Sequence, residues 1–542
     1  MGIYLNPGNS GFASIVKSDY VDKTGLISII NSTMETEKKF ICVSRPRRFG
    51  KSFAAQMLCA YYDKTCDSHE LFSGYHISED ANYEKKLNQY DVIYLDMTSF
   101  LGKTSPQKLV EFVQDRLISE IQRTYERVGI NGTLEEVLAH TADHTGNKFI
   151  MIIDEWDAPL RETPEIAEDY LEFLRSLFKN SGTASEIFAA VYMTGILPIK
   201  KYKNQLALPN FEESSVIKPG DFAGSLGFTE KEVKGICKEK NIDFEKMKLW
   251  YDGYTFGDKH SIFNPYSVMH AASSGKCKCY WKKTSAPNAL MAYIDMDFYD
   301  LQDKMARLIA GESVIVDTDS FQNDMQTFTC KDDVLTLLAH LGYLTYEQEP
   351  DSYDEDSVVG LVRIPNREIR SEYNTILRKS KHKRLIELVR KSDQLLKDTL
   401  NGKSEIVAKA IADVHDSEYA STYYSNEQRL RYVVKMAYIS CVDQYAKVEE
   451  LPSGHGIADV VFLPKLRSTL PAMIVELKWD KDAEGAIKQI KDRNYPKILT
   501  NYGSRIVLVG VNYDEDTKTH TCVIEEYKRT ERSFRLLITN GR

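Results

Sequence analysis

The chain has 542 residues, more than one hydrophobic core usually supports, so we expect roughly two to four domains. Hydrophobic residues make up 42% and charged residues 27% of the sequence, which is ordinary for a soluble globular protein. The net charge of −9 excludes a chain that binds polyanions through its overall charge, so any nucleic-acid site must be a local basic surface.

The start of the chain and its cysteines predict a cytoplasmic protein without a membrane partner. Residues 1–7 lack the basic and then apolar pattern of a signal peptide, and no apolar run reaches the roughly 18 residues that span a bilayer. The nine cysteines are scattered and form no paired C-x-x-C sets. Reduced thiols are therefore favoured over a disulfide framework or a zinc site.

The first chemical signal is a strand followed by a phosphate-binding loop and a helix. Phe40–Ser44 is a short apolar run, and a helical apolar pattern begins after Gly50, Lys51 and Ser52. Backbone N–H groups at a helix N-terminus bind phosphate, a lysine adds positive charge, and a serine hydroxyl can ligate Mg²⁺. The general pattern G-x-x-x-x-G-K-[ST] has glycine where this chain has Arg45.

Three further apolar runs predict the rest of a parallel sheet. They span Asp91–Met97, Phe149–Asp157 and Ile187–Ile196, and segments with helical patterns separate them. Continuous apolar strands of this kind are covered on both faces, and ligands bind at the carboxyl ends of such strands.

Carboxylates at the end of one run have the form of a Walker B strand. In that interpretation Asp154 holds the Mg²⁺ shell and Glu155 polarises the attacking water. Thr194 ends the next run, where its hydroxyl could contact the γ-phosphate or simply satisfy a backbone group.

Together the motifs of this half resemble the bacterial AAA-ATPase-like family, and they cover roughly residues 5 to 285. They are Y-V-D-K-T (Tyr20 to Thr24), R-P-R-R-F-G-K-S (Arg45 to Ser52), D-E (Asp154, Glu155), T-G-I-L-P-I (Thr194 to Ile199), G-F-T-E-K-E-V (Gly227 to Val233), and Y-D-G-Y-T-F with F-N-P-Y-S-V (Tyr251 to Val268). The resemblance implies a P-loop-type ATPase domain over residues 1–285 that binds ATP, and a phosphate loop in which Arg45 is a regular member.

The loop carries three arginines, Arg45, Arg47 and Arg48. Guanidinium groups can stabilise the charge that builds on the γ-oxygens, either in cis or from a neighbouring copy in a homo-oligomer. Alternatively, these arginines pair with nearby carboxylates such as Asp22, Asp154 or Asp157. The predicted nucleotide-binding set is Arg45, Arg47, Arg48, Gly50, Lys51, Ser52, Asp154 and Thr194.

Residues 286–380 predict a small winged-helix-like α+β module. Asp332–Glu349 indicates a helix, a turn at Gly342 and a strand, and Val359–Asn366 indicates the returning strand. Such modules can bind DNA, but in ATPases they also serve as lids or protein interfaces. The acidic tip at Glu349–Asp356 argues against entry into a DNA groove. We therefore expect a connector that reports the nucleotide state.

Residues 381–542 predict an α/β domain with a helical lead-in and candidate catalytic side chains. Glu476 and Lys478 end an apolar strand and point to the same side, because strand side chains alternate. Asp459 lies inside another strand, and a helix carrying Glu427 precedes both. Two carboxylates can hold Mg²⁺ while the lysine orients a water or offsets phosphate charge. A Glu-x-Lys pair by itself carries little information, since exposed strands commonly show it.

This part resembles the PD-(D/E)XK nuclease superfamily through G-I-A-D-V-V-F, I-V-E-L-K-W and A-I-K-Q-I-K-D-R-N-Y. The resemblance implies a restriction-endonuclease-like α/β fold that uses Mg²⁺ or Mn²⁺. By the match, the catalytic core comprises Asp459, Glu476 and Lys478. Glu427 would be an extra metal ligand beside Asp459 and Glu476, and Gln489 and Tyr495 would support the phosphate or the fold.

The sequence therefore predicts a multidomain α/β protein in which an ATP-binding switch controls a Mg²⁺-dependent nuclease, with DNA preferred over RNA. Defence against foreign DNA would suit such a fusion. One alternative is a nucleotide-regulated binding or scaffold protein whose nuclease fold is catalytically silent. Another is ATP-driven motion along DNA.

Overall fold

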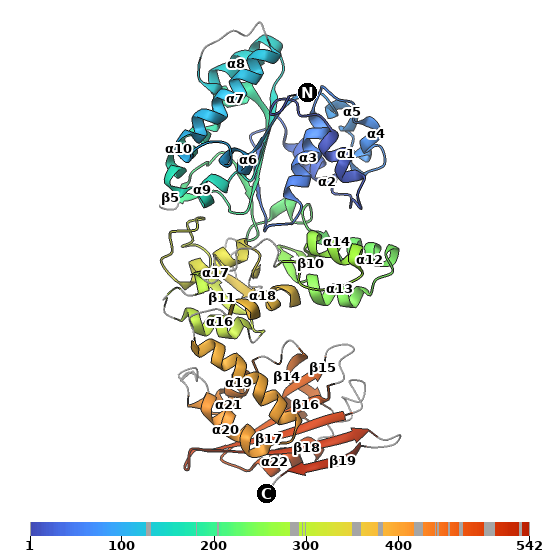
Figure 1. The fold of residues 1–542 in the computed structure, drawn as a ribbon, viewed down its shortest axis with the longest axis vertical. Coiled ribbons are helices and arrows are strands. Elements are labelled where there is room, and N and C mark those ends of the chain that lie inside the picture. Colours follow the sequence, from blue (N-terminus) through green and yellow to red (C-terminus); the bar gives the residue numbers. More distant parts are fainter. Residues whose placement is uncertain are drawn as a thin grey trace. The chain divides into compact units, whose positions relative to one another are not determined.

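The structure is a computed structural model, and its described residues form two compact units (Figure 1). The first unit comprises Met1–Ser285 and Ile315–Glu372, and the second comprises Ala286–Val314 and Tyr373–Arg542. The described residues are all except 1, 126–131, 180, 203–204, 282–291, 295, 297, 299, 310, 349–358, 378–382, 417–425, 440, 442–443, 454–455, 465–469, 493–504, 530–533 and 541–542.

A parallel five-stranded sheet forms the centre of the first unit, as predicted. Its order is β2 (Asp91–Asp96), β3 (Phe149–Asp154), β4 (Phe188–Gly195), β1 (Phe40–Ser44) and β7 (Glu212–Ser214). Every residue of β1, β3 and β4 is buried, which explains why these strands are continuous apolar runs. The strand ends are aligned, so that Asp96, Asp154 and Thr194 are neighbours across the sheet.

Helices cover both faces of this sheet, and a separate hydrophobic core lies under each layer (Figure 1). One layer contains α1 (Ser10–Val16), α2 (Gly25–Thr33), α3 (Lys51–Tyr62), α4 (His69–Phe72) and α5 (Tyr83–Lys86). The other contains α6 (Met97–Leu101), α7 (Leu109–Thr124), α8 (Leu134–Thr145), α9 (Ala158–Glu162), α10 (Ala167–Phe178) and α11 (Ser181–Ile187). Helix α1 was not predicted.

Two smaller groups of elements complete the first unit. The first group is β8 (Phe228–Thr229), β9 (Tyr254–Phe256), β10 (Lys259–Phe263), α12 (Glu230–Glu239), α13 (Phe244–Tyr251) and α14 (Pro265–Ser274). The second is β11 (Val314–Asp317), α17 (Lys331–His340), β12 (Thr345–Gln348), β13 (Val359–Arg363) and α18 (Arg367–Leu377), whose residues to Glu372 belong here. A two-stranded sheet, β5 (Lys201–Tyr202) and β6 (Gln205–Leu206), also occurs.

The helix, turn and hairpin expected in the middle of the chain are present. Gly342 has a positive φ of 83° after α17, and β12 pairs antiparallel with β13. The acidic tip at 349–356 lies outside the described residues. The segment 286–380 is divided between the two units, so a separate winged-helix-like domain there stays a prediction.

The second unit is built on a six-stranded sheet in the order of the sequence. The strands are β14 (Tyr445–Ser453), β15 (Gly456–Pro464), β16 (Ala472–Trp479), β17 (Arg505–Asp514), β18 (Thr519–Arg529) and β19 (Phe534–Asn540). The pair β16–β17 is parallel, and the others are antiparallel. The helices are α16 (Leu301–Ile309), α19 (Lys383–Leu400), α20 (Ser404–His415), α21 (Asn426–Ala437) and α22 (Ala483–Asp492). Strands β18 and β19 were not predicted.

Helix α22 connects the parallel strands β16 and β17 and packs its apolar residues on them. This crossover places one face of α22 over the carboxyl end of β16, where the candidate nuclease residues lie. Within the described part of the chain, no helix combines the length and the apolar character that crossing a bilayer needs.

Candidate nucleotide and nuclease sites

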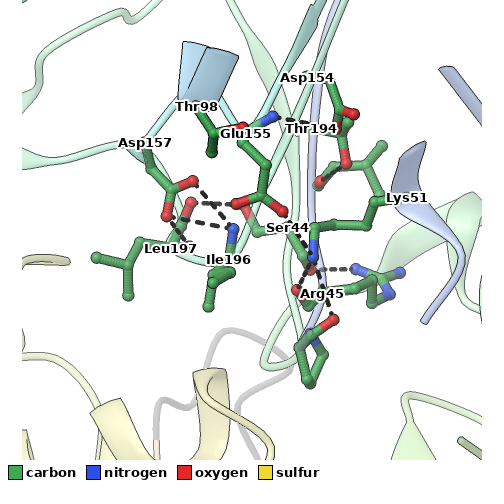
Figure 2. A network of polar contacts seen from close by, with 12 residues as sticks. Ser44, Arg45, Lys51, Thr98, Asp154, Glu155, Asp157, Thr194, Ile196 and Leu197 are labelled. Carbon is green, nitrogen blue, oxygen red and sulfur yellow. Dashed lines mark hydrogen bonds and ion pairs between the residues drawn. The ribbon is translucent and has the colours of Figure 1, made fainter. Parts of the chain in front are cut away.

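The predicted phosphate loop connects β1 to α3. Gly50 is the N-cap of α3 with φ 93°, a conformation that glycine adopts without strain. The side chain of Lys51 is only 4% exposed, and its Nζ donates to the carbonyl oxygens of Arg45 and Pro46, both at 3.2 Å (Figure 2). The same Nζ lies 3.5 Å from Glu155 Oε1. The lysine therefore lies where the loop, the helix N-terminus and the end of β3 meet.

The Walker B candidates lie beside this lysine. Asp154 ends β3 and is buried, and burial raises its pKa to about 6 although a hydrogen bond with Ser52 opposes the shift. Tyr94 Oη also contacts Asp154 Oδ2 at 3.5 Å. Ser52 and Asp154 thus present two oxygen ligands side by side, which suits a Mg²⁺ ion that also contacts phosphate oxygens.

Glu155 lies between two basic side chains, and sequence reasoning missed one of them. It has a φ of 50° and pairs with Arg161 Nη2 at 2.8 Å as well as with Lys51. Burial would raise the pKa of Glu155, but Lys51 and Arg161 outweigh that effect and hold it below its usual value. Arg161 also donates its Nε to Asp157. Asp157 in turn accepts from the backbone N–H groups of residues 196 and 197 (Figure 2). The helical i, i+4 spacing of Asp157 and Arg161 was the available signal.

Arg45 does not reach the nucleotide side of the loop, which corrects the expectation that it binds phosphate. Its side chain is completely buried, and its Nη atoms donate to the carbonyl oxygens of Ser44, Ser214 and Phe222 and to Ser214 Oγ. The guanidinium also lies 4.9 Å from the centre of the Phe256 ring, and burial lowers its pKa to about 10. Arg45 therefore anchors the loop from behind.

The other two arginines of the loop differ from Arg45. Arg47 is exposed, and its charge helps to lower the pKa of Glu155. Arg48 has a φ of 71°, donates to the carbonyl of Tyr280 at 3.2 Å and lies 4.3 Å from the centre of the Tyr266 ring. Arg48 lines the cavity beside the loop.

Thr194 satisfies a backbone group, as the simpler of its two interpretations predicts. Its hydroxyl donates to the carbonyl oxygen of Val43 at 3.0 Å, and the side chain is buried between β4 and β1. Its place across from Asp154 keeps it near the strand ends, but the hydroxyl proton faces β1.

A cavity of about 390 Å³ opens next to the phosphate loop. Gly50, Lys51, Ser52 and Glu155 line one end, and the rest of the lining is mostly apolar. Its apolar lining comes mainly from Ile15, Val21, Phe49, Met57, Phe228, Pro265, Tyr266 and Met269. Phosphate-loop residues together with a mostly apolar lining suit a nucleotide, and the volume is within the usual range for ligand sites.

The segment around Gly342 packs on the back of the phosphate loop. A Cβ atom at position 342 would lie 2.7 Å from Cβ of Pro46, so the two backbones approach closely. Tyr254 Oη donates to the carbonyl oxygen of Gly342 at 2.8 Å, and Thr255 N donates to Thr345 Oγ1 at 2.9 Å. The loop is therefore in direct contact with the hairpin that we expected to report its state.

The candidate nuclease residues are brought together in the second unit. Asp459 on β15 accepts from the backbone N–H of Leu477 at 2.8 Å, which ties it to β16 between Glu476 and Lys478. Gln489 on α22 donates its Nε2 to Glu476 Oε1 and accepts from Lys478 Nζ at 2.6 Å. Lys478 Nζ is also 3.5 Å from Glu476 Oε1. The predicted core therefore forms one hydrogen-bonded cluster, with Gln489 fixing the two side chains of the E-x-K pair.

Comparisons with known proteins identify the families of the two domains. Residues 8–203 match the model of the family described as predicted AAA-ATPase, and residues 425–522 match that of the PD-(D/E)XK nuclease superfamily. The chain joins an AAA-ATPase-like domain to a PD-(D/E)XK nuclease superfamily domain. Both predicted resemblances are thus confirmed, and the two families indicate ATPase and nuclease chemistry.

A relative aligns with nearly the whole chain. Over 531 residues the chain is 22% identical to a protein of Azotobacter chroococcum mcd 1 described as "Uncharacterized protein in vnfD 5'region", with 94% of this chain and 96% of that protein covered. Two structures of the Aeropyrum pernix ORC2 protein, in ADPNP–ADP and ADP forms, align with 67% of this chain at 11% identity. The alignments cover 96% and 97% of the ORC2 chains, with TM-scores of 0.31 and 0.28.

The donor set of the PD-(D/E)XK domain fits the divalent cation that its superfamily implies. Asp459 accepts the backbone N–H of Leu477, the residue after Glu476, and carboxylates are the oxygen ligands that Mg²⁺ prefers. The described residues contain no group of three or more His, Cys, Asp or Glu side chains arranged for a metal ion. The side chain of Glu427 and residue Tyr495 lie outside the described residues, so the role of each stays a prediction.

Proposed function

We propose that the protein binds and hydrolyses ATP and cleaves phosphodiester bonds of nucleic acid, DNA in preference to RNA, with Mg²⁺ or Mn²⁺. The cluster of Asp459, Glu476, Lys478 and Gln489 carries the nuclease proposal, because a purely structural role does not require two carboxylates and a lysine to converge beside a PD-(D/E)XK strand.

Each residue of the cluster has a separate task in hydrolysis. A cation bound by Asp459 and Glu476 would polarise the phosphate and lower the pKa of an attacking water. Lys478, whose side chain is 12% exposed, can orient water or offset charge on the phosphate. Gln489 holds Lys478 and Glu476 in fixed positions.

The ATPase proposal rests on the position of the phosphate loop, which lies beside the carboxyl end of β3. Gly50 and Lys51 bind the phosphates, Ser52 and Asp154 hold Mg²⁺, and Glu155 activates water. The contact between Pro46 and Gly342 offers a route by which the loop moves the hairpin when phosphate binds. We infer that ATP controls the nuclease, in a cytoplasmic role such as defence against foreign DNA.

Cleavage of plasmid, linear and single-stranded DNA and of RNA, each with Mg²⁺ or Mn²⁺ and with or without ATP, tests the nuclease. We expect wild type to cut DNA faster than RNA and Lys478→Ala to lose at least about a hundred-fold in rate, as for a general acid–base group. Lys481→Ala, at an exposed lysine of the same segment, is the matched control. If wild type cuts nothing under any condition, the alternative of a nucleotide-regulated scaffold with a silent nuclease fold takes its place.

ATP turnover is tested separately with Lys51→Ala and Glu155→Gln. We expect Lys51→Ala to lose nucleotide binding and Glu155→Gln to bind ATP but turn it over slowly. Unchanged turnover in Lys51→Ala would remove the phosphate loop from the mechanism.

A further inference from the structure

A basic residue that the sequence did not single out belongs to the nuclease cluster. Arg431 on α21 places its Nη2 3.0 Å from Asp459 Oδ1. The other carboxylate oxygen of Asp459 accepts the backbone N–H of Leu477. Both oxygens that a cation would use on Asp459 are therefore already hydrogen-bonded to donors of the protein.

The two carboxylates differ in their access to solvent and in their partners. The side chain of Asp459 is 21% exposed and that of Glu476 only 1%. Arg431 is also 21% exposed, so part of its side chain reaches solvent, whereas Lys478 is 12% exposed and is bonded to Glu476 and Gln489. Arg431 thus pairs with the more accessible of the two carboxylates.

The charges of these four side chains balance. The positive charges of Arg431 and Lys478 offset the negative charges of Asp459 and Glu476. A divalent cation that binds Asp459 must therefore compete with the guanidinium of Arg431 for the carboxylate oxygen. A phosphate group supplies what that guanidinium prefers, because two parallel N–H donors match two phosphate oxygens. Relocation of Arg431 from Asp459 to a phosphate would free the carboxylate and neutralise the substrate at once.

We propose that Arg431 competes with the divalent cation for Asp459 and leaves it for a phosphate of the nucleic acid, so that cation and substrate bind cooperatively. The inference rests on the proposed nuclease function and assigns this arginine to the same site. By linkage, nucleic acid tightens cation binding by the same factor by which the cation tightens nucleic-acid binding. The device keeps the site from holding a reactive cation before substrate arrives.

The test measures Mn²⁺ binding to the full-length protein by electron paramagnetic resonance, with and without a short phosphorothioate DNA duplex that resists cleavage. The relevant Mn²⁺ site is the one lost in Asp459→Ala. For wild type we expect the duplex to tighten Mn²⁺ binding at least about five-fold, the lower end of usual couplings. Arg431→Ala should bind Mn²⁺ at least about five-fold more tightly without DNA, and the effect of the duplex should fall below about two-fold.

Two further variants keep the result interpretable. Arg390→Ala removes the same charge from an exposed position on α19 and should behave as wild type. Arg431→Gln keeps a hydrogen-bond donor for Asp459 without the charge, and should show the tighter Mn²⁺ binding even if the alanine variant folds poorly. Mn²⁺ binding that is unchanged or weaker in Arg431→Gln, or a duplex effect as large as in wild type, would overturn the proposal.

The outcome separates this inference from the nuclease proposal. Cooperative binding that depends on Arg431, without cleavage of any substrate, would leave the inference standing and remove the nuclease function. Cleavage with Mn²⁺ binding that does not depend on Arg431 would do the reverse.

Discussion

The burial of Arg45 allows a sharp test of which loop arginine serves the fold and which serves the nucleotide. Replacing it in Arg45→Met keeps much of the side-chain volume and removes all of the N–H donors. The carbonyl oxygens of Ser214 and Phe222 then lose a charged donor each, and Phe256 loses the guanidinium that lies 4.9 Å from the centre of its ring.

The magnitude follows from these contacts. Leaving a buried acceptor without its donor costs about 1–3 kcal/mol, and a desolvated cation–ring contact adds about 1–2 kcal/mol. Against this, the variant no longer buries a charge, whose cost is evident in the lowered pKa of Arg45. We expect a net loss of about 3 kcal/mol, a large share of the roughly 5–15 kcal/mol that stabilises a typical domain.

Chemical denaturation followed by tryptophan fluorescence measures the loss, and titration with a fluorescent ATP analogue measures nucleotide binding. Arg47→Met is the matched control, because Arg47 is an exposed arginine of the same loop. It should change stability by less than about 0.5 kcal/mol and weaken nucleotide binding or turnover. An Arg45→Met protein as stable as wild type but unable to bind nucleotide would refute the reasoning and return Arg45 to the phosphates.

Two further predictions concern the end of α17 and the turn that follows it. Gly342→Ala should destabilise the protein by about 2–4 kcal/mol and weaken nucleotide binding, because φ is positive there and the new Cβ would meet Pro46 of the loop. Gly275→Ala is the control, because Gly275 also has a positive φ but open space around it; it should cost about 1 kcal/mol and leave nucleotide binding unchanged. Burial lowers the pKa of His340 to about 3, so the unfolded chain binds a proton below about pH 6.5 that the folded chain does not. Stability should therefore fall by about 1 kcal/mol from pH 7 to pH 5.5, and His340→Phe should remove that part of the pH dependence; an unchanged pH dependence in the variant would show that other groups cause it.

Local pattern was sufficient for the strands that carry the sites. The strands β1 and β3 and the strand β16 are continuous apolar runs because both faces of each are covered, and each was predicted to within a few residues. Strand β18 was missed because Thr519–Arg529 has a largely polar sequence. Its strand conformation depends on pairing with β17 and β19 rather than on its own apolar content.

The roles of the arginines could not be predicted in the same way. From the sequence alone, the guanidinium of Arg45 could equally well bind a phosphate or be buried inside the domain. The choice depends on the carbonyl oxygens of Ser214 and Phe222, which lie far away in the sequence. Arg431 was missed for the same reason, because its partner Asp459 lies on a different element of the chain. Arg161 was missed although its i, i+4 spacing from Asp157 was a local signal.

In each candidate site a basic side chain is bound to hydrogen-bond acceptors of the protein itself. Lys51 donates to two carbonyl oxygens of its loop and pairs with Glu155, and Arg431 pairs with Asp459. A phosphate that draws Lys51 or Arg431 away would therefore remove one contact of a carboxylate. That carboxylate is the one proposed to activate water in the first site and to hold the metal ion in the second. Glu155 would keep its ion pair with Arg161, and Asp459 would keep its hydrogen bond from Leu477. Substrate binding would thus make each carboxylate more available for its proposed role.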